Sequence, residues 1–422
     1  MSKRNRISLT GADKFMLALE PEHQLEGTTG NTCKYVLELK GRFHVPNFIQ
    51  NVRENEVALW LAECYIHPSR GSKKFWSHHF NHQISFSVYE DCLVEEILFK
   101  RQLDKHKGPL FGFDIIVNNE NTPDETTIIV FSWHHLLMDG YGAVLFLRNL
   151  VSPVKVQPIV AKQFRLNWKS LQGMIKVKRY ITKSSSGNIA TPVSQDVSFA
   201  ISQYCDISFS KEETQKIEQN ALKHGAKFGI GSYLLACTAQ QIMTTELLPE
   251  FTKKHDAWVP VPHDMRKKGD AWPIIGNHLS FVYYRISGST IDSTTGTVQS
   301  INEQLLHQIK NNLPESNAHL MHYLKKLPLT AYRRLIKGKN RKSLASFLFT
   351  VAAEHPSDFN TFFDCPITNA YSIPPNTLPP GLTIAFNRFD DKISIVVQSY
   401  EHAIKREQLV DLAQSIRAIL LK

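Results

Sequence analysis

The sequence predicts an α/β protein built from two lobes, and three observations lead to this prediction. The chain has 422 residues, which is too long for one ordinary hydrophobic core and suits two domains of ordinary size. Stretches with the two-residue period of strands alternate with stretches that have the apolar spacing of helices. A segment of small and polar residues with Gly and Pro, beginning at Lys183, interrupts the pattern as a flexible linker does. We therefore predict an N-terminal lobe over residues 1–183, a linker over 184–196 and a C-terminal lobe over 197–422.

Local patterns define the elements of the first lobe. Thr10 is placed to cap a short helix, residues 35–40 have the character of a strand, and residues 45–62 have helical apolar spacing. Farther along, residues 126–133 form a β-branched and aromatic run of strand length. Residues 143–150 have the apolar density of a buried helix. The first lobe is thus predicted to combine strands with covering helices.

The second lobe begins with a similar alternation. Residues 204–210 are predicted to form a strand. Ser210 and Glu213 have the spacing of a capping box, which satisfies exposed amides at a helix start, and Gly225 is suited to end that helix. A second helix is predicted over residues 232–247. This order of elements indicates a second α/β unit.

The remaining third of the chain continues in the same way. Residues 258–262 and 278–286 are predicted strands, and a third strand is predicted over residues 393–400. Helices are predicted over residues 301–313 and, as a basic amphipathic stretch, over 318–337. A closing helix carries apolar residues on one side, namely Leu409, Leu412, Ile416 and Leu420.

Composition and charge limit the classes of function. The chain is 42% hydrophobic and 21% charged, which is typical of a globular protein and excludes wholesale disorder. Its formal net charge of +10 favours an acidic partner, and nucleic acid, an anionic membrane, coenzyme A phosphates and an acidic carrier protein all qualify. The sequence has no zinc-finger spacing, no RNP-like aromatic pattern and no heptad zipper. We therefore expect no nucleic-acid partner.

Cysteine usage and hydropathy indicate the compartment. The six cysteines are scattered singly, several of them within apolar runs, which is typical of free buried thiols in a reducing compartment. The basic N-terminus is not followed by an apolar stretch, so we expect no secretion signal. No run of about 18 apolar residues is present, so we expect no transmembrane segment. The protein is predicted to be cytoplasmic.

The segment 131–142, with the sequence FSWHHLLMDGYG, concentrates the residues that carry chemistry. It places two adjacent histidines, an aspartate and two glycines between a predicted strand and a predicted helix. Because neighbouring side chains of a strand point to opposite faces, His134 and His135 enter one pocket together only if the backbone bends there. One histidine is therefore predicted to be chemical and the other structural.

Two other interpretations of the histidines are weaker. A second adjacent pair, His78 and His79, lies in the aromatic segment 75–86 but lacks the trailing Asp-Gly, so we interpret it as surface and packing residues. A zinc site needs three or four ligands in a closing geometry. The sequence contains no HExxH and no cysteine pair with ligand spacing, so no metal site is predicted.

Residues 134–140, HHLLMDG, resemble the HHxxxDG signature of the acyltransferases related to chloramphenicol acetyltransferase. That superfamily includes condensation domains, wax ester synthases and polyketide-associated acyltransferases. Residues 108–114 resemble its PL segment, residues 276–280 its GN segment, and residues 225–237 its helix with the core LLA. The resemblance covers nearly the whole chain. It implies two chloramphenicol acetyltransferase-like lobes, each a mostly antiparallel or mixed sheet with flanking helices, and an active-site tunnel between them.

The resemblance also implies roles for the motif residues. Acyl transfer needs a base for the attacking hydroxyl or amine, and imidazole is suited because its pKa lies near neutrality. His135 is the implied base, and His134 supports local structure. The resemblance implies that Asp139 forms an ion pair with Arg266. Gly140 and Gly142 are expected to remove Cβ atoms where backbone approaches closely, and the Gly140 amide is a candidate to face the tetrahedral oxyanion.

Several residues are predicted to contact substrate. Asn277 of the GN segment and Trp133, directly before the histidines, are two candidates. Arg333 and Arg334 belong to the basic run 333–342, which either binds phosphate or a carrier protein or is a solvated face. The basic stretch 166–180 is interpreted as a solvated helix face.

From these features we predict a freestanding acyltransferase. It is expected to move an acyl group from an acyl-CoA or acyl-carrier-protein thioester to a hydroxyl or amine, with the phosphopantetheine thioester as co-substrate and no permanently bound cofactor. The expected partners are a small-molecule acceptor and the thioester donor, with possible peripheral membrane contact by a monomer. The alternatives are a nonribosomal-peptide-type condensation enzyme, a catalytically silent carrier-protein-binding relative and a basic membrane-surface protein.

Overall fold

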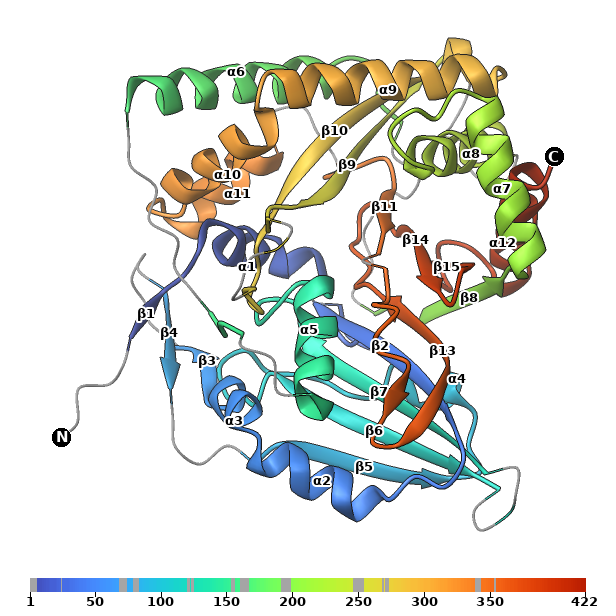
Figure 1. Cartoon of the computed structure of the whole chain (residues 1–422). Helices are drawn as coiled ribbons and strands as arrows, with labels where there is room; N and C mark the ends of the chain where they lie inside the picture. Colours follow the sequence, from blue (N-terminus) through green and yellow to red (C-terminus); the bar gives the residue numbers. More distant parts are fainter. Residues whose placement is uncertain are drawn as a thin grey trace.

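The computed structural model shows two sheets, each with its own helices, and a layer of helices and a hairpin beside them (Figure 1). It describes residues 6–23, 25–67, 74–78, 83–119, 122, 125–152, 156–159, 167–190, 199–245, 254–267, 269, 273–337, 343–352 and 354–422.

The first sheet has six strands in the order β12-β13-β2-β7-β6-β5. All neighbours are antiparallel except β5 and β6, which are parallel. The strands are β2 (Thr32–Lys40), β5 (Ser85–Glu90), β6 (Phe111–Asn118), β7 (Thr126–His134), β12 (Thr361–Phe362) and β13 (Cys365–Ile373). β2 and β7 lie in the middle of the sheet, and their side chains are almost all buried because the sheet is covered on both faces.

The second sheet has four strands in the order β11-β14-β15-β8, with only the β11 and β14 pair parallel. Its strands are β8 (Ser202–Ser208), β11 (Leu348–Val351), β14 (Leu382–Phe389) and β15 (Lys392–Tyr400). A long antiparallel hairpin is formed by β9 (Asp256–Asp264) and β10 (Leu279–Ser287). A small sheet near the N-terminus contains β1 (Ile7–Ser8), β3 (Cys64–Ile66) and β4 (Phe75–His78).

The helices cover these sheets or connect them (Figure 1). Those of the first half are α1 (Gly11–His23), α2 (Val45–Glu54), α3 (Glu56–Ala62), α4 (Val94–Ile97), α5 (Gly140–Val151) and α6 (Trp168–Ser184). Those of the second half are α7 (Lys211–Lys223), α8 (Gly231–Thr244), the 3-10 turn η1 (Gly288–Thr290), α9 (Thr294–Lys310), α10 (Leu313–Leu324), α11 (Leu329–Lys337) and α12 (Arg406–Leu420). The expected two-lobed fold with mixed sheets and flanking helices is confirmed.

Two predicted helices are each divided in the structure. The stretch 45–62 forms α2 and α3 because Asn55 adopts an extended conformation and its side chain accepts a hydrogen bond from the Ala58 amide at 2.9 Å, which starts a new helix. The stretch 318–337 belongs to α10 and α11. Pro328 disfavours a helical conformation in the residue before it, and the chain turns there.

One strand crosses the predicted division of the chain at residues 184–196. β13 lies in the predicted C-terminal lobe, yet it pairs with β2 of the first sheet from Lys34 to Leu39. α6 ends at Ser184, where the predicted linker begins, and residues 191–198 lie outside the described part. The C-terminal half of the chain therefore completes the sheet of the N-terminal half.

Each lobe has its own hydrophobic core. A third cluster joins the two sheets and contains residues from both, including Val36, Val130 and Tyr371 of the first sheet and Tyr204, Ala385 and Val396 of the second. Within the described residues, no helix is long and apolar enough to cross a membrane.

Candidate active site

The histidine pair lies where β7 ends and the chain turns toward α5. The backbone N–H of His134 donates to the carbonyl of Leu110 at 2.8 Å, so the predicted PL segment lies beside the motif. The backbone N–H of His135 donates to the carbonyl of Asn31 at 2.9 Å. These two bonds hold the histidines between the ends of neighbouring strands, and their rings enter different surroundings.

The His134 ring is buried in a polar network. Its Nδ1 accepts a hydrogen bond from the Leu136 amide at 3.2 Å, which leaves the proton on Nε2. Nε2 lies 3.1 Å from Glu20 Oε1 and donates to it. Glu20 also accepts from Lys105 at 3.3 Å and from Asn31 at 3.3 Å. The orientation of the His134 ring is thus set by two partners, which fits a structural role.

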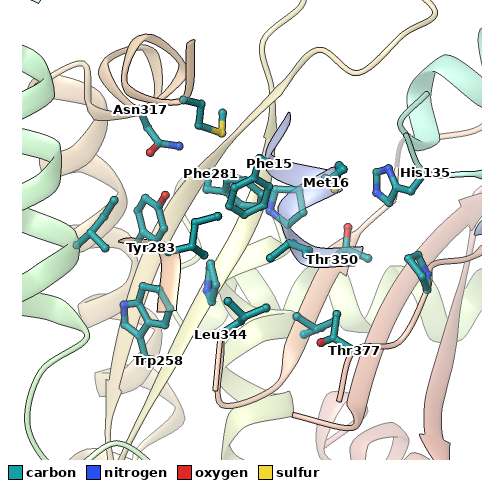
Figure 2. Close-up of a pocket in the computed structure, with 18 of the residues that line it drawn as sticks. Phe15, Met16, His135, Trp258, Phe281, Tyr283, Asn317, Leu344, Thr350 and Thr377 are labelled. Atoms are coloured by element: carbon teal, nitrogen blue, oxygen red, sulfur yellow. The ribbon is translucent and has the colours of Figure 1, made fainter. Parts of the chain in front are cut away.

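The His135 ring instead lines a cavity between the lobes (Figure 2). Its Nδ1 atom is buried. Burial lowers the pKa of the imidazole, and this effect exceeds the opposing influence of its own carbonyl oxygen and of the Asp139 carboxylate. At neutral pH the ring is therefore uncharged, which is the form in which it acts as a base.

The cavity has a volume of about 390 Å³ and is mainly apolar. Helices α1, α6, α10 and α11, the β9–β10 hairpin, β11 and the segment before β14 form its wall, with contributions from Phe15, Met16, Ile181, Trp258, Phe281, Tyr283, Leu320, Tyr332 and Phe349. Figure 2 shows His135 at one end and Trp258 and Asn317 toward the other. A cavity of this size and lining is typical of sites for largely apolar small molecules.

A second histidine, which the sequence analysis missed, also lines this cavity. His23 ends α1, is 3% exposed, and its Nδ1 lies 2.9 Å from the carbonyl of Asn376. Because a carbonyl only accepts, Nδ1 carries the proton and Nε2 has a lone pair. Burial lowers the pKa of His23 to about 4, so the ring is neutral. In the sequence His23 is a lone histidine near a helix end, and it lies 112 positions before His135.

Asp139 and Arg266 form the expected ion pair. The two guanidinium nitrogens donate to the two carboxylate oxygens at 3.0 and 2.9 Å, and both side chains are at most 9% exposed. Asp139 also accepts from the Gly142 amide at 2.8 Å as the N-cap of α5, and from the His278 amide at 2.8 Å. One carboxylate thus begins α5 and binds the GN segment of the second half of the chain.

Of the two glycines at which a close backbone approach was expected, Gly142 has one and Gly140 does not. A Cβ at Gly142 would lie 1.8 Å from the carbonyl oxygen of Ile275, whereas a Cβ at Gly140 would meet nothing within 4 Å. The steric expectation for Gly140 is therefore wrong. Gly140 is also not among the residues that line the cavity, and the oxyanion role of its amide stays a prediction.

Two of the predicted substrate contacts lie outside the cavity wall. The Asn277 side chain is buried and donates to the carbonyls of His135 at 2.9 Å and Leu136 at 2.8 Å, so it holds the backbone of the motif. The Trp133 ring is 1% exposed in the first core, and its N–H donates to the carbonyl of Met138 at 2.9 Å. The alternation of side chains along β7 places Trp133 on the face of the sheet that packs into the first core. Its position next to His135 in the sequence does not reveal this.

Arg333 and Arg334 belong to α11, whose Tyr332, Leu335 and Ile336 line the cavity. Arg333 is partly buried and Arg334 is exposed. Residues 338–342 of the basic run lie outside the described part. His79, from the second adjacent histidine pair, also lies outside it. The two arginines therefore lie on a helix that forms part of the cavity wall, but neither is among the residues that line the cavity.

Comparison with known proteins connects this geometry to a fold. No protein-family model matches the sequence. In an alignment of 332 residues that covers 74% of this chain, the sequence is 20% identical to bacitracin synthase 3 of Bacillus licheniformis. The chain spans only about 5% of the length of that protein.

Solved structures match over almost the entire chain. The TRI3 trichothecene 15-O-acetyltransferase from Fusarium sporotrichioides has a TM-score of 0.73 at 12% identity, covering 99% of this chain and 94% of that one. The first condensation domain of the calcium-dependent antibiotic synthetase has a TM-score of 0.72 at 14% identity, with 99% and 95% coverage. The starter condensation domain of rhizomide synthetase RzmA, solved with C8-CoA, has a TM-score of 0.68 at 13% identity, with 99% and 94% coverage. The chain therefore has the fold shared by condensation domains and chloramphenicol acetyltransferase-like acyltransferases.

Proposed function

We propose that this protein is an acyltransferase that moves an acyl group from a thioester to a hydroxyl or amine, with His135 as the general base. The observation that carries the proposal is the position of His135, a neutral imidazole at the wall of a large apolar cavity between the lobes. The fold supports the same class, because its solved examples include an acetyltransferase and a condensation domain bound to C8-CoA.

The reaction needs only one protein base. His135 Nε2 takes the proton of the acceptor hydroxyl or amine as the acceptor attacks the thioester carbonyl. The tetrahedral intermediate collapses, the carbon–sulfur bond breaks, and the imidazolium returns the proton to the leaving thiolate. The ester or amide and the free thiol are the products, and the imidazole is regenerated. The thioester is the co-substrate, and the proposal requires no permanently bound cofactor.

The cavity and its surroundings suggest how the substrates bind. The apolar wall fits an acyl chain or an apolar acceptor. Arg333 and Arg334 on α11 are candidates for binding the charged end of an acyl-CoA or the phosphopantetheine of a carrier protein. The proposal includes a cytoplasmic monomer, and the six cysteines, none of which forms a disulfide, support a reducing compartment.

A condensation-type function is the second candidate. The 332-residue match to a peptide synthase and the likeness to condensation domains favour it. The chemistry at His135 would be the same, with an amine acceptor and a carrier-bound donor.

The test is thioester consumption by the purified protein. Octanoyl-CoA and an octanoylated carrier protein serve as donors, free thiol is measured, and alcohol and amine acceptors are compared. We expect acceptor-dependent thiol release that His135→Ala abolishes. Release that persists in His135→Ala, or no release with any combination, would reject the proposed base. Preference for carrier protein and amine would select the condensation-type function.

Salt dependence tests the donor site. Exposed cation contacts are screened over a Debye length of about 8 Å at physiological ionic strength. The KM for the donor should then rise with salt, and Arg333→Gln with Arg334→Gln should have the same effect, while the rate at saturation hardly changes. If neither salt nor the two substitutions change the KM, this part of α11 is a solvated face and does not bind the donor.

A further inference from the structure

The outward face of α6 combines apolar and basic side chains in a regular arrangement. Figure 1 shows α6 on the outside of the molecule, at the end away from the first sheet. We call the α6 face the set of Trp168, Leu171, Ile175, Lys176, Arg179 and Lys183. The apolar residues Trp168, Leu171 and Ile175 occur at positions i, i+3 and i+7. The cations Lys176, Arg179 and Lys183 follow with the same spacing. Two turns of apolar surface are thus followed by two turns of positive charge.

The apolar half of this face is exposed to an unusual degree. Trp168 is 72% exposed, Ile175 is 46% exposed and Leu171 is 37% exposed. The opposite side of the same helix packs into the protein through Met174 and Val177. The exposed parts of these side chains therefore make no contribution to the packing of α6, and the exposure of so much tryptophan surface to water is unfavourable.

The basic half faces a groove suited to phosphate. Lys176, Arg179 and Lys183 line a depression of about 260 Å³ between α6 and the end of α9, together with Tyr180, His307, Asn311 and Leu313. The Tyr180 and His307 rings stack at 5.7 Å between centroids and join the two helices. No acidic residue occurs in α6. The groove therefore offers cations, with no carboxylate from α6 to neutralise them.

The buried side of α6 is connected to the proposed site. Lys178 and Ile181 of α6 line the 390 Å³ cavity that contains His135. Ser184, at the end of α6, accepts a hydrogen bond from the indole N–H of Trp258, which lines the same cavity, at 3.2 Å. A surface bound to the exposed side of α6 would thus be separated from the apolar cavity by this helix alone.

We propose that the α6 face docks on an anionic phospholipid bilayer, with its apolar residues at the headgroup boundary and lipid phosphates in the basic groove. Tryptophan prefers this boundary because its ring is apolar and its N–H is polar. A helix with basic residues beside exposed Trp, Leu and Ile is typical of helices that lie in the plane of the interface. This inference goes beyond the proposed acyl transfer and does not depend on it.

A second copy of the chain would not complement the positive charge of the α6 face. In a parallel two-fold contact of α6 with α6, the cations of one helix would meet those of the other, and in an antiparallel contact they would meet its apolar half; neither helix supplies an acidic residue. An anionic bilayer supplies the opposite charge along the whole helix. Each cation near such a surface contributes about 1 kcal/mol of attraction.

Vesicle sedimentation with the full-length protein tests the proposal. Phosphatidylcholine vesicles are compared with vesicles that contain one quarter phosphatidylglycerol. One variant combines Trp168→Ser, Leu171→Ser and Ile175→Ser, and another combines Lys176→Gln, Arg179→Gln and Lys183→Gln. The matched control on α7 combines Leu222→Ser, Lys216→Gln and Lys223→Gln, because Leu222 is 73% exposed and both lysines are exposed. Circular dichroism melts verify that each variant folds.

We expect wild type and the α7 control to sediment with the anionic vesicles and not with phosphatidylcholine alone. The cation variant should lose on the order of 100-fold in partition coefficient, following the attraction per charge given above. The apolar variant should lose more than tenfold and retain its salt dependence. Brominated lipids should quench wild-type fluorescence more than that of Trp168→Phe.

Four outcomes would overturn the proposal. The first is wild type that does not sediment with anionic vesicles. The second is an α7 control that loses as much binding as the α6 variants. The third is wild type that forms dimers in sedimentation velocity while the apolar variant is a monomer, which would make a second copy the occupant. Full competition by millimolar glycerol phosphate would likewise show a site for soluble phosphate and not a bilayer surface.

Discussion

At the scale of single residues, the adjacent histidines have different environments because β7 ends between them. His134 is the last residue of the strand and points to a buried carboxylate, whereas His135 follows it and lines the cavity. The division of roles comes from backbone geometry, since both side chains have the same chemistry. Replacing each in turn should therefore give opposite phenotypes.

The first prediction concerns this pair. His135→Ala should lower turnover by about 10²–10⁴-fold, the usual contribution of a general base, and leave the melting temperature nearly unchanged. His134→Ala removes a hydrogen-bond donor from buried Glu20 and should lower the free energy of unfolding by about 1–3 kcal/mol. Steady-state kinetics and chemical denaturation measure the two effects. The reverse ranking would exchange the roles of the two residues.

The wild-type rate should also depend on pH in a defined direction. Because burial lowers the pKa of His135, the acid limb of kcat/KM should lie below pH 6.5, the ordinary value for histidine. The rate falls as pH falls, since protonation removes the lone pair that acts as base. An acid limb above that value would contradict a desolvated imidazole.

The second prediction concerns His23, whose two nitrogens can be tested separately. An asparagine amide reaches the position of Nδ1, so His23→Asn should keep the bond to Asn376 and lose the group at Nε2. His23→Gln should do the converse. If Nε2 positions a substrate by accepting a hydrogen bond through its lone pair, His23→Asn raises KM at nearly constant melting temperature. His23→Gln lowers the melting temperature instead.

Stability against pH gives an independent measure of His23. Its pKa of about 4 in the folded protein lies below the ordinary 6.5, so the unfolded chain binds more protons between these values. The contribution to stability is present above pH 6.5 and is lost as pH falls toward 4. Both variants should therefore show a shallower loss of stability over this range than wild type. Parallel curves would mean that the ring is charged or solvated in the folded state.

At the scale of elements, the start of α5 joins the two halves of the chain. Asp139 is the N-cap of this helix, and the same carboxylate receives the Arg266 guanidinium and the His278 amide. Gly142 allows the carbonyl of Ile275 to approach α5. The helix start, the ion pair and the GN segment therefore stabilise one another.

The third prediction is that Asp139→Asn destabilises the protein by about 3–5 kcal/mol, because the change removes the buried partner of the Arg266 charge and leaves only the exposed Asp264 carboxylate beside it. Thermal melts measure the loss. Asp358→Asn is the control, because this carboxylate pairs with Arg148 at an exposed position, where an ion pair is worth about 0–1 kcal/mol. Equal melting temperatures for Asp139→Asn and wild type would contradict a buried pair.

The fourth prediction uses the two glycines as a matched pair. Gly142→Ala forces the Ile275 carbonyl to move and should cost about 1–3 kcal/mol, as overpacking does. It should also lower turnover, because the displaced segment includes Asn277, which holds the His135 carbonyl. Gly140→Ala meets no atom and should be neutral or slightly stabilising. Equal effects of the two changes would show that no close contact is present at Gly142.

At the scale of the whole molecule, the lobes are not independent along the chain. β13 comes from the second half but completes the first sheet beside β2, and a shared cluster joins both sheets. The first half alone would expose the edge of β2 and its apolar neighbours. Unpaired edges of this kind promote aggregation.

The fifth prediction follows from this exchange. Residues 1–190 expressed alone should be insoluble, whereas the same fragment co-expressed with residues 199–422 should be recovered as a complex. Affinity purification of the tagged first fragment measures the recovery. A soluble 1–190 fragment with a cooperative melt would show that β13 is dispensable.

The sequence alone determined the features that depend on local order. Periodicity predicted the strands at 126–133 and 393–400 and the helix before Gly225, because such elements form wherever apolar residues recur with the correct period. The motif identified His134, His135 and Asp139, and the resemblance paired Asp139 with Arg266. Fold class was predictable for the same reason, since the order of elements restricts their packing.

Tertiary structure decided which residues share the cavity. His23 and His135 meet there from a helix end and a strand end that are distant in sequence, while Trp133, next to His135, points into the core. Asn277 binds the motif backbone, although the sequence suggested a substrate contact. β13 joined the first sheet across the predicted boundary. These contacts depend on how distant segments pack, and packing free energy is set by three-dimensional complementarity, which local sequence patterns do not encode.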